Sequence, residues 1–157
     1  MKKLFVKPNK YALVDNEDFE SLKTFNWWLD RHGYAGAQVY LRDGKRSSKR
    51  IAMHREILKA SKNKEVDHIN HNPLDNRKSN LRLVTRQQNH FNEKIRKNNT
   101  SGYKGVCWNK DRNKWMAYIH LDGKFKHLGL SIDIKNAILL RKTAEIKHHG
   151  EYAYNMI

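Results

Sequence analysis

The sequence predicts an α+β protein assembled from small modules, and three observations support this fold class. With 157 residues, of which 38% are hydrophobic, the chain can form only modest cores. Short runs with strand-like alternation are separated by turn sequences rich in Asn, Asp and Gly, and few stretches have helical periodicity. We therefore expect a mixed N-terminal lead-in, a core of strand, loop, strand and helix, and a small three-stranded antiparallel sheet packed on one helix.

The lead-in, residues 1–60, mixes strands with short helices. Its strongest local signal is Asp43-Gly44 between two strand-like runs, which is typical of a β-hairpin. The aromatic residues Phe19, Tyr34, Trp27 and Trp28 are interpreted as core packing. The expected elements are an extended run at 11–14, an amphipathic turn around Phe19, Leu22 and Phe25, strands at 34–41 and 49–53, and a short helix at 54–60.

A polar segment divides the chain. Residues 98–103 lack apolar periodicity and read as a linker between an N-terminal domain, 1–97, and a C-terminal domain, 104–157. The runs KGVCWN, KWMAYIHL and KFKHLGL follow, separated by the turn strings KDRN and DG. A helix-periodic stretch over 134–148 ends before Gly150. This order predicts three antiparallel strands followed by one helix.

The net positive charge of the chain indicates the kind of partner that it binds. The chain carries 32 Lys and Arg against 16 Asp and Glu, a net charge of +16, and every part of the chain has a basic surplus. Such a distribution favours an extended polyanion, and nucleic acid is expected rather than a membrane. The first residues contain too short an apolar run before Pro8 for a signal peptide or membrane helix, and the single Cys107 excludes a disulfide framework. A cytoplasmic location is expected.

Residues 66–92, VDHINHNPLDNRKSNLRLVTRQQNHFN, contain the chemical centre. Asp67 and His68 are adjacent at the end of an apolar-leading run, and a loop rich in Asn, Pro and Asp follows. Asn80 then introduces the strand LRLV, and Thr85 with Gln88 forms a capping box that starts a helix. This arrangement allows Asn89, one turn inside the helix, to point back across the hairpin toward Asp67.

A carboxylate and an amide oxygen directed at one point are hard oxygen ligands suited to a divalent ion. One Mg²⁺ is expected, with Mn²⁺ able to substitute, and water and phosphate oxygens would complete its coordination. His68 has an unperturbed pKa of about 6.5 and could remove a proton from a water beside the scissile phosphorus. Adjacent residues on an extended chain diverge, so Asp67 and His68 can take separate roles.

The segment at about 50–95 strongly resembles the HNH (ββα-metal) endonuclease motif, in the variant with Asn in place of the final His. The resemblance implies that Asp67 and Asn89 are metal ligands, that His68 is the general base, and that Asn80 ties the loop and keeps His68 oriented. His71 is a departure, because close relatives often have Gly there. His54 occupies a place where similar nucleases carry a His-Arg pair, and we interpret it as helix packing and support.

The C-terminal pattern, residues 101–150, resembles the APETALA or ethylene-responsive-factor type of DNA-binding domain. In KWMAYIHL one face of the strand, with Trp115 and Ile119, suits packing under the helix, and the other would be an exposed surface for DNA. Cys107 and Tyr118 replace charged residues typical of the plant domains, so no base preference is carried over. The resemblance implies these DNA-facing side chains: Lys104, Asn109, Tyr118, His120, Lys124 and His127.

Together these resemblances imply a site-specific, homing-type endonuclease that hydrolyses phosphodiester bonds of double-stranded DNA, of the kind encoded by mobile introns or free-standing in phage genomes. A single active site cuts one strand, so a monomer is expected to nick, and no obligatory protein partner is expected beyond a weak homodimer. The alternative is a non-catalytic DNA-binding regulator that keeps the scaffold. An RNA-binding protein gains no support, because the aromatic signature of such domains is missing.

Overall fold

The computed structural model describes residues 1–42, 46–93, 95 and 97–154. It is a mixed α+β structure with several small antiparallel sheets and few helices, as the sequence predicts. The chain separates into two compact units, Met1–Arg86 and Gln87–Ile157. The sequence places its division at 98–103, whereas in the structure the helix that follows the LRLV strand groups with the C-terminal unit.

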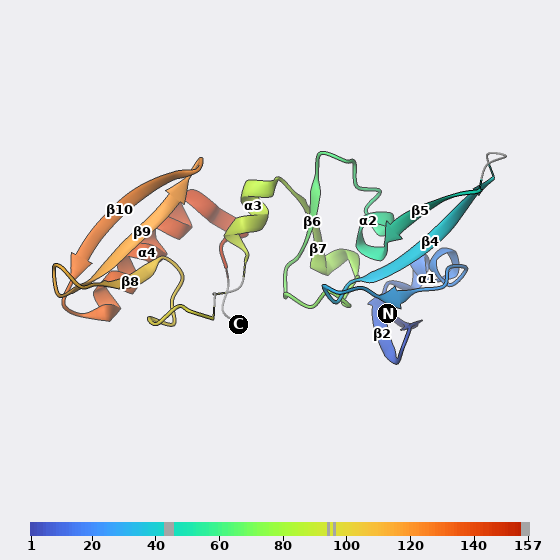
Figure 1. The fold of residues 1–157 in the computed structure, drawn as a ribbon, viewed down its shortest axis with the longest axis horizontal. Coiled ribbons are helices and arrows are strands. Elements are labelled where there is room, and N and C mark those ends of the chain that lie inside the picture. Colours follow the sequence, from blue (N-terminus) through green and yellow to red (C-terminus); the bar gives the residue numbers. More distant parts are fainter. Residues whose placement is uncertain (43–45, 94, 96, 155–157) are drawn as a thin grey trace. The chain divides into compact units, whose positions relative to one another are not determined.

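The N-terminal unit contains three antiparallel sheets, a two-stranded β1–β2, a three-stranded β3–β4–β5 and a two-stranded β6–β7 (Figure 1). Each predicted strand of this region is present. The elements are β1 (Lys2–Val6), β2 (Lys10–Val14), α1 (Asn16–Leu22), β3 (Trp28–Leu29), β4 (Ala35–Arg42), β5 (Arg46–Ala52), α2 (Met53–Ile57), β6 (Glu65–His68), the short 3-10 helix η1 (Lys78–Asn80) and β7 (Leu81–Val84).

One hydrophobic core joins the lead-in to the β6–β7 hairpin. Val6 and Val14 from the first hairpin, Trp27, and Leu81 from β7 belong to the same buried cluster. Trp27 is buried, and its Nε1 donates a hydrogen bond of 2.8 Å to the carbonyl oxygen of Leu22. The lead-in is therefore not a separate module, because its apolar side chains fill the core beneath the hairpin.

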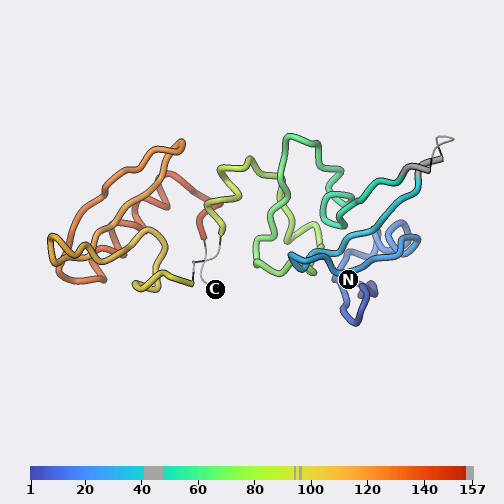
Figure 2. The backbone as a smooth tube through the Cα atoms, in the orientation of Figure 1, coloured from blue at the N-terminus to red at the C-terminus, as the bar shows by residue number. Residues whose placement is uncertain are grey.

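The predicted hairpin of the lead-in is present as β4 paired with β5, and the two strands run side by side in the backbone trace (Figure 2). The turn residues Asp43 and Gly44 lie outside the described residues. The helix expected at 54–60 is α2, which begins at Met53 and ends at Ile57. It is shorter than predicted because the chain leaves helical geometry after Leu58, where Lys59 has a φ of +47°.

The C-terminal unit has the three predicted strands and the predicted helix. Its antiparallel sheet has the order β10–β9–β8, and α4 packs on β9 (Figure 1). Asp122-Gly123 joins β9 to β10 with positive φ at both residues, as a two-residue hairpin turn of type I′ requires. The elements are α3 (Arg86–Phe91), β8 (Val106–Asn109), β9 (Lys114–Leu121), β10 (Lys124–Ser131), α4 (Ile134–His149) and the 3-10 turn η2 (Gly150–Tyr152).

The small core of the C-terminal unit is completed by a buried ion pair. Val106, Ala117 and Ala137 form its apolar centre. Arg141 is buried on α4, its Nη2 lies 2.9 Å from Oε1 of Glu145, and its Nη1 donates to the carbonyl oxygen of Tyr118. The helix therefore contacts the sheet through a charged pair as well as through apolar side chains.

No helix in the described ranges combines the length and the apolar character that crossing a membrane requires.

Candidate functional site

The β6–β7 hairpin places Asp67 and His68 at the end of β6. In the antiparallel register Asp67 lies opposite Arg82 and His68 lies opposite Leu81. Both Asp67 and His68 are buried. Neighbouring residues on a strand direct their side chains to opposite faces, so the carboxylate and the imidazole reach different surroundings although they are adjacent in the chain.

The carboxylate of Asp67 is bound by Arg82 across the hairpin. Nε of Arg82 donates to Oδ2 of Asp67 at 2.8 Å, and Nη2 lies 2.7 Å from the same oxygen. The side chain of Asp67 is 8% exposed and that of Arg82 is 14% exposed, which makes this a largely desolvated ion pair. Arg82 is not among the residues predicted from the sequence, although its place opposite Asp67 follows from pairing 65–68 with 81–84.

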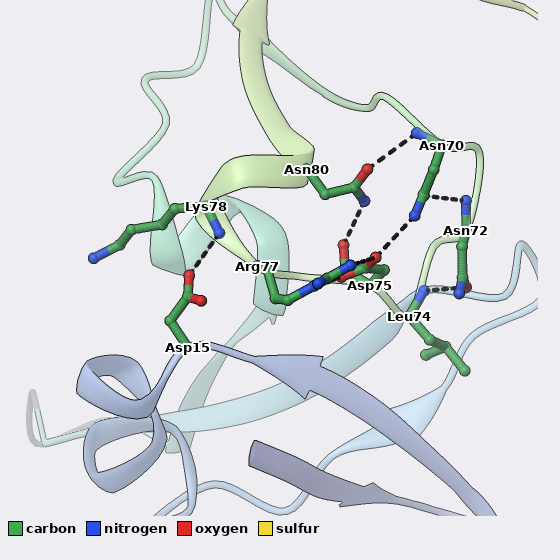
Figure 3. Close-up of polar contacts among 8 residues, drawn as sticks. All are labelled: Asp15, Asn70, Asn72, Leu74, Asp75, Arg77, Lys78 and Asn80. Carbon is green, nitrogen blue, oxygen red and sulfur yellow. Dashed lines mark hydrogen bonds and ion pairs between the residues drawn. The ribbon is translucent and has the colours of Figure 1, made fainter. Parts of the chain in front are cut away.

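Asn80 closes the loop between the two strands (Figure 3). Its Oδ1 accepts a hydrogen bond from the backbone N–H of Asn70 at 3.0 Å, and its Nδ2 donates to the carbonyl oxygen of Asp75 at 2.8 Å. Its own carbonyl oxygen accepts from the N–H of Ile69. The buried side-chain amide of Asn80 thus connects Asn70, at the start of the loop, to Asp75, farther along it.

Asp75 is the second anchor of this loop. Its carboxylate accepts from Nε and Nη2 of Arg77 at 2.7 and 2.6 Å and from Nδ2 of Asn70 at 2.8 Å (Figure 3). The hydrogen bonds from Arg77, reinforced by the one from Asn70, hold the pKa of the Asp75 carboxyl below its usual value despite burial. The loop is therefore fixed by charged hydrogen bonds at a buried position.

His68 contacts aromatic and amide groups. Nε2 of His68 is 3.3 Å from Oδ1 of Asn76, and the rings of His54 and Tyr34 have centroids 5.2 and 5.7 Å from the His68 ring. Burial lowers the pKa of His68, opposed by the hydrogen bond to Asn76 and by nearby carboxylates. Burial lowers the pKa of His54 to about 3, so His54 is a neutral neighbour at physiological pH. The sequence predicted packing for His54 but did not indicate Asn76.

His71 occupies a left-handed position just after β6. Its φ is +59°, and its N–H donates to the carbonyl oxygen of His68 in a tight turn. Glycine adopts this conformation without the steric cost that a side chain carries. The geometry therefore suits Gly at this position, and His71 adopts it with a side chain.

Asn89, the predicted second metal ligand, lies in α3 and so belongs to the C-terminal unit, whereas Asp67 belongs to the N-terminal unit. The pairing of these two oxygens stays a prediction. Within its own unit α3 is held near its C-terminal end. The ring of Phe91 stacks on His149 with centroids 3.7 Å apart, and Nζ of Lys104 donates to the carbonyl oxygens of His90 at 2.6 Å and Phe91 at 3.4 Å.

The outer face of the C-terminal sheet presents a cluster of three rings. Tyr118 and Phe125 stack with centroids 5.3 Å apart, and His120 lies within 5.7 Å of both rings. His127 pairs with Tyr118 in the register and shares their face. Phe125 is not among the residues predicted from the sequence, although the alternation in KFKHLG puts it on the same face as His127.

The other three predicted DNA-facing residues have different settings. Lys104 precedes the sheet and donates to the end of α3, and Oδ1 of Asn109 accepts from the N–H of Arg112 in the β8–β9 turn. Lys124 pairs with Leu121, which places it on the face opposite to Tyr118 and His120, although its side chain is exposed. The structure therefore gathers Tyr118, His120 and His127 but not the two lysines.

Within the described part of the chain, no group of three or more His, Cys, Asp or Glu side chains is arranged to hold a metal ion. This excludes a closed site built from those side chains among these residues. The predicted pair of one carboxylate and one amide oxygen is not such a group.

Comparisons with known proteins agree with the motif. Residues 59–91 match the HNH endonuclease family. The chain is 36% identical to Protein 3.8 of Escherichia phage T7 over 88 residues, which cover 56% of this chain and 72% of that protein. It is also 36% identical over 142 residues to a protein of Acanthamoeba polyphaga mimivirus named Uncharacterized HNH endonuclease L560, covering 87% of this chain and 66% of that protein. No solved structure matches the chain significantly. From the matched motif and these relatives we conclude that the chain belongs to the HNH endonuclease family and is a DNA nuclease.

Proposed function

We propose that this nuclease is a site-specific, homing-type endonuclease that nicks double-stranded DNA by hydrolysing a phosphodiester bond with the help of one divalent metal ion. The observation that carries the proposal is the pair of buried residues Asp67 and His68 at the end of β6, beside a loop that Asn80 closes. A DNA-binding scaffold alone has no need of a desolvated carboxylate next to a buried, neutral imidazole.

In this proposal His68 acts as the general base that takes a proton from the attacking water. The depressed pKa of His68 keeps its imidazole neutral and able to accept a proton at physiological pH. Asn80 acts indirectly, because its hydrogen bonds to Asn70 and Asp75 fix the loop that follows His68. Arg82 orients the carboxylate of Asp67.

HNH nucleases typically use a divalent metal ion, and Asp67 fits this use. Its buried, charged oxygen is the hard donor that Mg²⁺ or Mn²⁺ prefers, and we propose Asn89 as the amide ligand on the basis of the sequence pattern. When bound, the ion supplies electrostatic stabilisation to the charge that develops on the phosphate and on the departing 3′ oxygen.

We further propose that residues 104–157, joined by the linker 98–103 to a nuclease domain 1–97, grip DNA through the outer face of the sheet, as the likeness to ethylene-responsive-factor domains implies. Support comes from the ring cluster of half-buried Tyr118 with exposed His120 and Phe125 on a strongly basic chain. Aromatic and imidazole side chains on a sheet face can enter a DNA groove, and basic groups neutralise phosphates.

Supercoiled plasmid and phage DNA incubated with the protein and Mg²⁺ or Mn²⁺ test the nuclease site. We expect nicking that chelator abolishes and that falls at least 10²-fold in His68→Ala and Asp67→Ala, because each change removes a group on which the chemical step depends. DNA binding measured by gel shift should persist in both variants. Undiminished nicking in His68→Ala would exclude this assignment, and binding without any cutting by the wild type would favour the regulator.

The gripping role has its own test. We expect Phe125→Ala to weaken DNA binding about 3–10-fold at moderate salt, since one ring contact contributes on the order of 1 kcal/mol. The matched control is Leu139→Ala, which removes an exposed apolar side chain from α4 and should leave affinity unchanged. Equal affinity of the two variants in a salt titration would refute the proposed DNA face.

A further inference from the structure

We propose that Asn76 is a positioning residue that fixes the tautomer of His68, so that Nδ1 is the ring nitrogen that accepts the proton from water. This inference rests on the proposed function, in which His68 is the general base. The contact that carries it is the 3.3 Å approach of Nε2 of His68 to Oδ1 of Asn76. Both side chains are buried, Asn76 completely, so bulk water does not compete for the contact between Nε2 and Oδ1.

The direction of this hydrogen bond follows from the other side of the amide. Nδ2 of Asn76 lies 3.5 Å from the carbonyl oxygen of Pro73, which can only accept. If the amide were turned over, its oxygen would face that carbonyl and two acceptors would oppose each other. Oδ1 therefore faces His68, and Nε2 must carry the proton. In a neutral imidazole the lone pair then belongs to Nδ1.

The backbone of Asn76 is held by the N-terminal hairpin. Its N–H donates to the carbonyl oxygen of Leu13 at 2.8 Å, and the N–H of Leu13 donates to the carbonyl oxygen of Leu74 at 2.8 Å. Leu13 belongs to β2, well outside residues 59–91 that match the family. The β1–β2 hairpin thus places the amide that orients the base, and it is part of the catalytic arrangement.

Two rings prevent His68 from turning away from Asn76. Tyr34 and His54 pack against the imidazole with centroids 5.7 and 5.2 Å away, the latter in a T-shaped arrangement. Tyr34 and His54 also contact each other at 5.0 Å, so they form a continuous wall. With one ring nitrogen held by Asn76 and the ring faces held by this wall, the direction of Nδ1 is set before substrate binds, which is the condition for efficient general-base catalysis.

The direct test is ¹⁵N NMR of the histidine side chains in the full-length wild type at pH 7.5, with His68→Ala used to identify the His68 signals. We expect a protonated Nε2 and an unprotonated Nδ1. A proton on Nδ1 overturns the proposal whatever the activity. This measurement needs no folded Asn76 variant.

The kinetic test compares two loop variants. Asn76→Ala should lower kcat about 30–100-fold with the KM for DNA changed less than about threefold, because the base loses its orientation while DNA contacts remain. Asn72→Ala, at an exposed position of the same loop, should stay within about threefold of wild type. Equal losses in both variants, or a wild-type rate in Asn76→Ala, refute the positioning role. Nicking that persists in His68→Ala would instead contradict the proposed function. The NMR measurement of the tautomer does not depend on that function, so the two failures can be told apart.

Discussion

Asp67 and Arg82 form a charge pair across the β6–β7 hairpin, beside His68. Their side chains are largely desolvated, and the two contacts from Arg82 converge on one carboxylate oxygen. The attraction offsets the cost of burying a carboxylate, and removal of one partner leaves a buried charge. The same guanidinium places positive charge beside a proposed metal ligand, so it opposes the binding of a divalent cation.

We therefore predict that Arg82→Gln lowers the free energy of unfolding in the absence of metal by about 3–5 kcal/mol. The melting temperature should then rise more on addition of Mn²⁺ than in wild type, since binding to the folded state stabilises it by mass action. Thermal unfolding with and without Mn²⁺ measures both effects. Arg50→Gln is the control, because the Arg50–Asp30 pair has an exposed arginine and should contribute under about 1 kcal/mol. A smaller Mn²⁺ response in Arg82→Gln would count against the proposed ligand role of Asp67.

At the scale of single residues, the sequence predicts which side chains belong to the candidate site better than it predicts which residues they contact. Asp67, His68 and Asn80 could be singled out because their spacing follows the strand, loop and strand order. Asn76 could not be chosen over Asn70 or Asn72, because its contact with His68 depends on the path of the loop past Pro73 and on hydrogen bonds to Leu13 from a distant strand. Such contacts depend on tertiary structure and leave no local pattern.

At the scale of the elements, β9 and α4 both lie close to the backbone of Gly105. A Cβ added to Gly105 would lie 2.5 Å from the carbonyl oxygen of Tyr118 and 2.7 Å from Nε of Arg141, and the backbone there has a φ of +74°. Gly105→Ala should therefore destabilise the protein by about 3 kcal/mol or more, because it combines backbone strain with a clash against the buried Arg141. Urea unfolding measures the change.

Gly102→Ala is the matched control for that prediction. Gly102 has a similar φ of +70°, but none of the residues that the structure describes lies within 4 Å of an added Cβ. Its substitution should cost only the backbone term, about 1–2 kcal/mol. If the two variants lose equal stability, the close approach at Gly105 contributes nothing.

Elements were predictable where local periodicity and turn chemistry agree. The β9–β10 hairpin follows from Asp122-Gly123, and α4 follows from its spacing and from Gly150 at its end. The partner of α3 was not predictable, because the Phe91–His149 stack joins residues from opposite ends of the C-terminal unit. From sequence order alone, α3 is expected to pack on the β6–β7 hairpin that precedes it.

For the molecule as a whole, acid should be destabilising through buried neutral histidines. Burial lowers the pKa of His149 to about 4, and its two ring nitrogens have no hydrogen-bond partner among the described residues. In the unfolded chain His149 takes up a proton near pH 6.5, whereas in the folded protein it does so only near pH 4. Protonation therefore does not reduce the free energy of unfolding above pH 6.5, and it reduces it progressively as the pH falls toward 4. We predict that stability drops by about 1–3 kcal/mol between pH 7.5 and 4.5 from this residue.

His149→Phe isolates that contribution, because the new ring can still stack on Phe91 but cannot titrate. Urea unfolding at the two pH values should show a smaller acid loss in the variant than in wild type. His54, with a pKa of about 3, remains in both proteins and cancels in the comparison. An identical pH dependence in the two proteins would mean that His149 is not the responsible group.

The single core that runs from β1 and β2 through Trp27 to β7 has a practical consequence for engineering. A peptide cut to the 59–91 family match would expose Val66 and Leu81 to water and lose the strand that brackets the loop. Grafting this nuclease onto another DNA-targeting protein therefore requires transplanting the entire N-terminal unit together with α3, which contains the proposed ligand Asn89, and any piece that cuts into this unit should be unfolded.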